Sequence, residues 1–260
     1  EEAAKRRLNR VEGTLLAHGP LARGPAYYAL GFGHLMLRDF EEAESWLGAA
    51  MDSGFTDPEV ESALGIAQAM RRLESGGGEW RENQVSAEEI MRHLAASGPK
   101  TAGRDLFHRS LGLFVEDRLD DALETAREST RRTPWLYEAA QLEGEILIAR
   151  AERRRSGGDP NGAQSDLDRA GRAFGRGLEV ARSDAWLYEL EAERLLRVIE
   201  LLDPGDPMTG SLLADAERAA ASALRARPDL VGAQDVAERI QSMGGRFDAG
   251  FSESRSTGDG

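Results

Sequence analysis

Apolar side chains recur every three to four positions along almost all of this 260-residue chain, and no stretch alternates strictly between apolar and polar residues. The first pattern is typical of helices with one buried face, whereas strict alternation would indicate half-buried strands. Clusters of glycine, proline and serine, such as those at 75–78, 156–160 and 203–207, divide the pattern into pieces of about 12 to 20 residues. We therefore predict about twelve helices and no strands.

The predicted helices repeat at a fixed spacing. The tripeptide Ala-Leu-Gly occurs at 29–31 and again at 63–65, which is 34 residues later. The tetrapeptide Trp-Leu-Tyr-Glu occurs at 135–138 and at 186–189, 51 residues apart, and we assign the excess over 34 to an insertion at 156–166. Two other spacings between repeated features also exceed a multiple of 34 residues, and we assign the additional residues to loops predicted at 76–86 and 204–210. A period of this length indicates helix pairs that stack into a solenoid.

With this period the chain resembles the tetratricopeptide repeat (TPR) family, in which a small residue sits where two helices approach closely and bulky residues fill the gap between them. The first unit carries the resemblance best, at Tyr27, Leu30, Gly31, Phe40, Ala43, Leu47 and Ala50. The third unit matches at Ser110, Leu119, Ala122, Ala126, Ser129 and Pro134, and the fifth matches at Ala216, Ala220, Ala223 and Pro228. The sequence departs from the family where a tryptophan is usual, because Tyr27 or Glu61 stands there.

The resemblance implies an all-α fold, a right-handed helical solenoid of about five degenerate TPR units. The solenoid would cover residues 24–243, with a leading helix at 1–20 and a capping helix after the last unit. The stretch 244–260 is rich in glycine and serine and has no period, so we expect it to be a disordered tail.

A narrower resemblance covers residues 24–70. The run from Gly24 to Leu35 looks like the segment that follows the catalytic domain in some bacterial serine/threonine protein kinases, and the stretches 55–60 and 63–65 continue it. The chain also begins at Glu1 and not at a methionine. We therefore expect a piece of a longer bacterial signalling protein, in which a kinase domain would precede residue 1.

Composition and motifs argue against several kinds of site. The absence of cysteine excludes a disulfide scaffold, a thiolate zinc site and a cysteine nucleophile. A net charge of −13 argues against nucleic-acid binding, and no apolar run reaches the roughly 20 residues that a membrane helix needs. The four histidines each lie alone, and neither a phosphate-binding glycine loop nor a kinase catalytic motif is present. We predict a cytoplasmic, non-catalytic chain with no metal, cofactor, nucleic acid or membrane as a ligand.

Polar side chains on two of the predicted first helices are the candidate binding residues. In the TPR family the first helix of each unit lines a concave groove, so the resemblance implies a partner-binding groove lined by Glu138, Gln141, Glu145, Glu189 and Glu193. Because neighbouring first helices bring like positions together, we expect Glu138 and Glu189, 51 residues apart, to share one acidic surface that favours a basic partner. The alternative is that Glu193 pairs with Arg197, four residues on, and that the remaining side chains are simply solvated.

Two tryptophans and one histidine have structural interpretations as well as functional ones. Trp135 and Trp186 begin the repeated tetrapeptide, and we expect them to pack between adjacent units, with a ligand-stacking platform as the alternative. His34 stands where the family is usually aromatic, so we expect it to be buried.

The resemblance therefore implies that the chain is a TPR-like scaffold that binds a protein or peptide in its groove. Two other functions stay open. The solenoid could be a sensor that binds a small ligand, which would require a pocket with converging polar groups. It could also be a structural spacer that associates with itself.

Overall fold

The computed structural model describes residues 6–7, 11, 13–14, 20–74, 85–96, 102–203 and 205–256, with 20–22, 102 and 244–256 described as backbone only. In this part of the chain the regular elements are eleven helices and no strands. Their bounds are α2 (Pro20–Met36), α3 (Phe40–Asp52), α4 (Pro58–Glu74), α5 (Ala87–Ala95), α6 (Ala102–Val115), α7 (Leu119–Arg132), α8 (Tyr137–Ser156), α9 (Pro160–Val180), α10 (Ala185–Ile199), α11 (Met208–Ala226) and α12 (Val231–Ser256).

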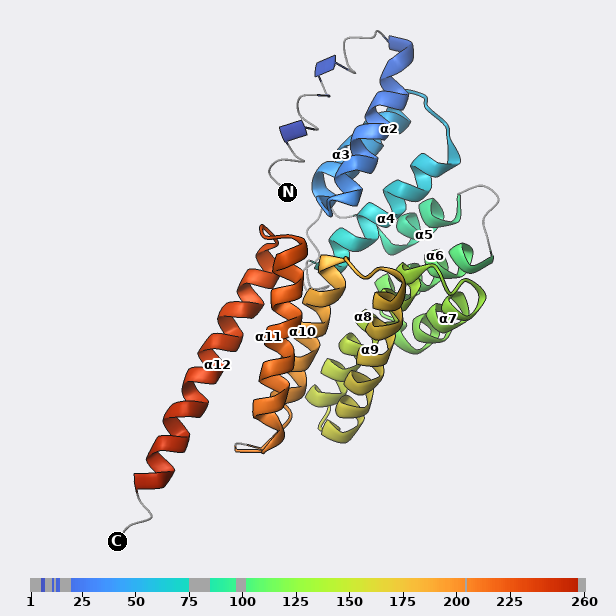
Figure 1. Ribbon diagram of the computed structural model, residues 1–260. Coiled ribbons are helices and arrows are strands. Elements are labelled where there is room, and N and C mark those ends of the chain that lie inside the picture. Colours follow the sequence, from blue (N-terminus) through green and yellow to red (C-terminus); the bar gives the residue numbers. More distant parts are fainter. Residues whose placement is uncertain are drawn as a thin grey trace. The chain divides into compact units, whose positions relative to one another are not determined.

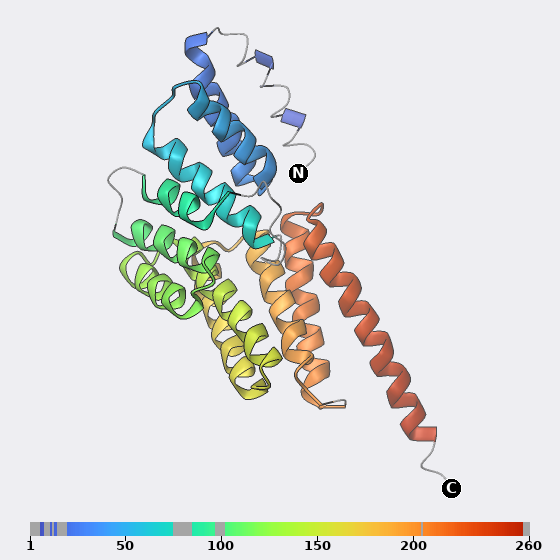
Figure 2. The same ribbon diagram turned by 180° about the vertical axis from the view of Figure 1, so that it is seen from behind.

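The helices pack in sequential pairs within two compact units, Glu1–Ala139 and Ala140–Gly260. In the first unit α2 pairs with α3, α4 with α5, and α6 with α7, as Figure 1 and Figure 2 show from opposite sides. In the second unit α8 pairs with α9 and α10 with α11, and α12 then packs on both α10 and α11. The predicted all-α fold of five helix pairs and a final capping helix is confirmed.

Small residues lie where the helices of a pair cross, as the 34-residue spacing predicts. A Cβ atom at Gly31 would lie 2.6 Å from Cγ of Leu47 and 2.9 Å from the backbone nitrogen of that residue. At Gly65 it would lie 2.8 Å from the backbone nitrogen of Leu94. Each glycine therefore lets two helix backbones approach more closely than any larger residue would allow.

The insertion predicted at 156–166 is wrong, because the extra residues are helical. Only three residues separate α8 from α9, and these helices are 20 and 21 residues long, against 13 for α3 and 14 for α7. Gly158 makes the turn with φ +81°, and the Asp159 side chain accepts a hydrogen bond from the Gly162 N–H at 2.8 Å. Pro160 is well suited to the first helical position, so this breaker begins a helix here and interrupts none.

The two ends of the chain differ in what the structure describes. The leading helix predicted at 1–20 and the loop predicted at 76–86 lie largely outside the described residues. The backbone of α12 continues as a helix to Ser256, through part of the stretch 244–260 whose composition predicts a disordered tail. A helix that is already nucleated by packing gains one hydrogen bond for each residue added, and this favours its continuation beyond the packed part.

Three buried histidines lie in the first unit: His34, His93 and His108. His34 is buried as expected, with Nδ1 3.5 Å from Oδ2 of Asp39. The His93 Nδ1 lies 2.9 Å from the side-chain oxygen of Gln68. Burial lowers the pKa of His93 below its usual 6.5, and the nearby positive charge of Arg92 adds to this effect.

We expect the first unit to lose stability on acidification through His93. The unfolded chain binds a proton to this histidine at a higher pH than the folded chain does, so its contribution is complete above about pH 6.5 and is lost as the pH falls through the lowered folded pKa. The urea midpoint measured at pH 7.5 and at pH 5.5 should therefore fall less in a His93→Gln variant than in the wild type. An equal fall in both proteins would contradict this assignment.

Candidate functional site

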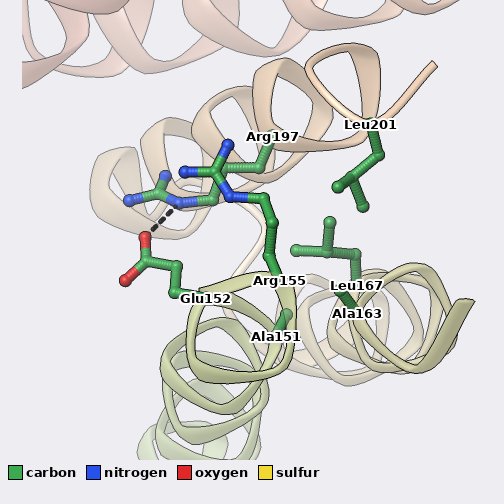
Figure 3. A pocket seen from close by; sticks show the side chains of 7 residues that line it. All are labelled: Ala151, Glu152, Arg155, Ala163, Leu167, Arg197 and Leu201. Atoms are coloured by element: carbon green, nitrogen blue, oxygen red, sulfur yellow. Dashed lines mark hydrogen bonds and ion pairs between the residues drawn. The ribbon is translucent and has the colours of Figure 1, made fainter. Parts of the chain in front are cut away.

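Ion pairs join α8, α10 and α12 on one face of the second unit. The Arg197 Nε of α10 donates to Oε1 of Glu152 on α8 at 2.8 Å, and Nη1 of Arg155 on α8 donates to Oε2 of Glu200 at 3.1 Å. Figure 3 shows the Arg155 and Arg197 guanidinium groups next to each other, with Glu152 bonded to the second. These contacts make α8 and α10 direct neighbours across a polar surface.

Arg239 extends the same surface to α12. Its Nη1 lies 3.7 Å from Oε1 of Glu193, and its Nη2 lies 3.5 Å from Oε1 of Glu200. Glu193 is also 3.0 Å from Nη1 of Arg197. We call this set the charge ladder; it consists of Glu152, Arg155, Glu193, Arg197, Glu200 and Arg239. Its three positive and three negative charges balance.

Arg197 is the central member of the charge ladder, with only 24% of its side chain exposed. Burial by itself would lower the pKa of this guanidinium, but Glu193 and Glu152 outweigh that effect and raise the pKa. The group therefore stays charged at every physiological pH, and it holds two helices together.

A shallow depression lies below the charge ladder, between α8, α9 and the end of α10. Its cavity volume is about 10 Å³, room for about one water molecule, and it is partly open to solvent. Its lining residues are Ala151, Glu152, Arg155, Ala163, Leu167, Arg197 and Leu201, and Figure 3 shows the side chains of Leu167 and Leu201 facing each other across it. Small-molecule pockets have volumes of about 300 to 1,000 Å³. The depression is therefore far too small for a small-molecule ligand.

Four of the five predicted groove residues lie in the second unit. Gln141 is buried and donates from Nε2 to Oε1 of Glu145 at 2.6 Å. Glu193 forms the predicted pair with Arg197 and is shared with Arg239. The Glu189 carboxylate is so close to Gly232, the second residue of α12, that a Cβ atom there would clash with it. A negative charge stabilises a helix N-terminus, and the first turn of α12 has no acidic residue of its own.

Glu138 belongs to the first unit and lies, partly buried, in the first turn of α8. The spacing that made it the counterpart of Glu189 is not the spacing of the contacts observed. Both ion pairs between α8 and α10 join residues that are 45 positions apart, whereas the repeated tetrapeptide is displaced by 51. Part of the difference arises because α8 begins two residues after Trp135, while α10 begins one residue before Trp186, so that the two helices start 48 residues apart. The two copies of the tetrapeptide therefore occupy different positions relative to their helices.

Trp135 and Trp186 differ in burial because they occupy different positions relative to the start of their helices. Trp186 lies in the first turn of α10, where it is partly buried and the Arg227 guanidinium lies 4.5 Å from its ring centre. Trp135 lies in the turn before α8 and is 69% exposed, so the prediction that it packs between units is wrong.

The described part of the chain offers neither a metal-binding cluster nor a membrane-spanning helix. No group of three or more histidine, aspartate or glutamate side chains there is arranged to hold a metal ion. No helix described there is both long enough and apolar enough to cross a membrane.

The comparisons with known proteins bear on the fold. No protein-family model matches the chain, and no curated protein matches it. Among solved structures, the TPR protein TTC0263 of Thermus thermophilus is similar with a TM-score of 0.51 and 17% identity, over 84% of this chain and 97% of that one.

Two further structures are less similar. Pseudomonas aeruginosa pilF gives a TM-score of 0.43 at 15% identity, over 90% of this chain and 99% of that one. YrrB, described as a TPR protein with an unusual peptide-binding site, gives 0.42 at 12% identity, over 82% and 91%. The likeness to TTC0263 shows the fold alone, and the two lower scores add no argument to it. The chain therefore shares its fold with TPR proteins.

Proposed function

We propose that the chain is a non-catalytic TPR scaffold that binds a segment of a partner protein across the first helices of its last units. The observation that carries the proposal is the charge ladder, because its ion pairs connect α8, α10 and α12 side by side. Three neighbouring helices with polar side chains on one face form a surface long enough to hold an extended peptide.

We also propose that the partner segment is basic and contacts the predicted residues of the second unit, Gln141, Glu145, Glu189 and Glu193. Glu193 already pairs with Arg197 and Arg239, so a partner arginine would exchange with an internal one. Such an exchange costs little in the balanced charge ladder, because every carboxylate keeps a positive neighbour throughout.

The context that we favour is the regulatory region of a cytoplasmic bacterial serine/threonine kinase. The resemblance of residues 24–70 to the segment after such a catalytic domain supports this. Sequencing the complete reading frame would test it, and a frame without a kinase domain would exclude it.

A basic probe peptide would test the groove. We expect a fluorescent ten-residue peptide of alternating arginine and alanine to bind the wild type, and a Glu145→Gln/Glu189→Gln variant to bind it at least fivefold more weakly, because two carboxylates are lost. The measurement is fluorescence anisotropy at low and moderate salt. The control variant Glu42→Gln/Glu88→Gln removes two exposed acids of the first unit, so it has the same net charge as the groove variant but leaves the groove intact. Equal affinity of the two variants would exclude the proposed groove.

A further inference from the structure

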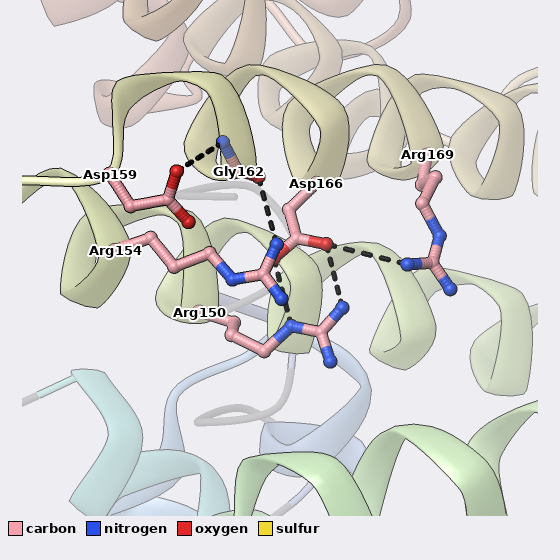
Figure 4. Close-up of polar contacts among 6 residues, drawn as sticks. All are labelled: Arg150, Arg154, Asp159, Gly162, Asp166 and Arg169. Carbon is pink, nitrogen blue, oxygen red and sulfur yellow. Dashed lines mark hydrogen bonds and ion pairs between the residues drawn. The ribbon is translucent and has the colours of Figure 1, made fainter.

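A buried carboxylate gathers three arginines on the α8–α9 pair (Figure 4). Asp166 of α9 is fully buried, and it accepts hydrogen bonds from Nε and Nη2 of Arg150 at 2.8 and 2.6 Å. This two-pronged pair is the strongest form of arginine–carboxylate contact. It is sufficient by itself to satisfy the buried charge of Asp166.

Two further arginines approach the same carboxylate at longer range. Nη1 of Arg154 lies 3.3 Å from Oδ2 and also donates to the Gly162 carbonyl at 3.1 Å, while Nη1 of Arg169 lies 3.6 Å from Oδ1. Their side chains are 36% and 34% exposed, against 13% for Arg150. Asp166 therefore orients two guanidinium groups that solvent can still reach.

The local charge differs in sign from that of the whole chain. Residues 150–176 contain seven arginines and four acidic residues, whereas the chain has a net charge of −13. Two nearby acids already have contacts, because Asp159 caps α9 through the Gly162 N–H and Glu143 binds Arg176 at 2.5 Å. Three guanidinium groups around one carboxylate repel each other, and further anions that contact Arg154 and Arg169 from the solvent side would relieve that repulsion.

We propose that Arg154 and Arg169, oriented by Asp166, bind the carboxylate or phosphate side chains of an acidic segment in a partner protein. Because the arginine side chains are already held in place, little conformational entropy is lost on binding. A protein segment fits better than a nucleic acid, since the overall negative charge repels a long polyanion and three arginines make no continuous track along a phosphate backbone.

This arginine cluster is a different surface from the charge ladder. Arg150 and Arg154 contact α9, whereas Glu152 and Arg155 contact α10 from another side of α8. The proposal is thus independent of the basic-peptide groove, and either can fail alone.

The test is a titration with four fluorescent ten-residue probes, followed by anisotropy. They are decaglutamate, a peptide alternating phosphoserine and alanine, decaglutamine, and a single-stranded DNA oligonucleotide. We expect the wild type to bind at least one of the two acidic peptides tenfold more tightly than decaglutamine, and the comparison between those two separates carboxylate from phosphate. An Arg154→Gln/Arg169→Gln variant, which keeps the Arg150–Asp166 pair, should lose at least tenfold in affinity for that peptide.

Matched controls make each outcome decisive. Arg182→Gln/Arg225→Gln removes two exposed arginines elsewhere in the second unit and should change the affinity less than twofold. The single variants Arg154→Gln and Arg169→Gln should each weaken binding about threefold if the double variant does not fold. Equal loss in the cluster and control variants, or no preference for either acidic peptide over decaglutamine, overturns the proposal. Tighter cluster-dependent binding of the oligonucleotide overturns it in favour of a nucleic acid.

Discussion

Replacing Gly31 with leucine is expected to lower the free energy of unfolding of the first unit by about 2 to 3 kcal/mol. Any side chain at this position meets Cγ of Leu47 at 2.6 Å and the backbone nitrogen of the same residue at 2.9 Å. The Leu47 side chain could move away, but the backbone nitrogen of Leu47 is fixed in α3. The two helices α2 and α3 would therefore have to separate. That separation would open the apolar cluster formed by Ala43, Leu47 and Val60.

The matched control is Gly48→Ala in α3, the partner helix. A Cβ atom there has no heavy atom within 4 Å, and alanine favours a helix over glycine by about 0.5 to 1 kcal/mol. Urea unfolding followed by circular dichroism should therefore show a lower midpoint for Gly31→Leu and an unchanged or higher midpoint for Gly48→Ala. A Gly31→Leu protein as stable as the wild type would mean that α2 and α3 do not cross here.

Replacing Asp166 with alanine is expected to destabilise the second unit by about 3 to 5 kcal/mol. The substitution removes the fully buried carboxylate that Arg150 bonds through two nitrogens and that Arg154 and Arg169 approach. Three positive charges would then remain together without the anion that holds them, and Arg150, with only 13% of its side chain exposed, would have to move into solvent.

Asp168→Ala is the control for this substitution, because Asp168 lies on the same helix but is exposed and accepts one hydrogen bond from Gln164 at 3.0 Å. Its free energy of unfolding should stay within about 0.5 kcal/mol of that of the wild type. Asp166→Asn keeps the side-chain volume and removes the charge, so it should lose most of the same stability. If Asp166→Asn were as stable as the wild type, the charge of Asp166 would not be what stabilises the α8–α9 pair.

The helix pairs could be predicted from the sequence because their determinants are local and periodic. Apolar spacing identifies a helix, a breaker ends it, and a small residue every 34 positions, such as Gly31 and Gly65, marks where paired helices cross. These signals predicted five pairs and a capping helix without reference to any distant contact. They failed at 156–166, where a glycine turn and Pro160 look like a long loop but join two extended helices.

The candidate site could be predicted only in part, because the partner of a charged side chain depends on the register between helices. The ion pair between Glu193 and Arg197 joins residues four positions apart on one helix, so it could be predicted from the sequence alone. The contacts of Arg155 with Glu200 and of Arg239 with Glu193 depend on how α8, α10 and α12 are aligned. A shift of six residues, from the expected spacing of 51 to the observed 45, moves a side chain about 9 Å along a helix and changes which charges meet. Local sequence therefore determined which helices form, whereas tertiary packing determined that Glu193 is shared with arginines of two helices and that Asp166 gathers three.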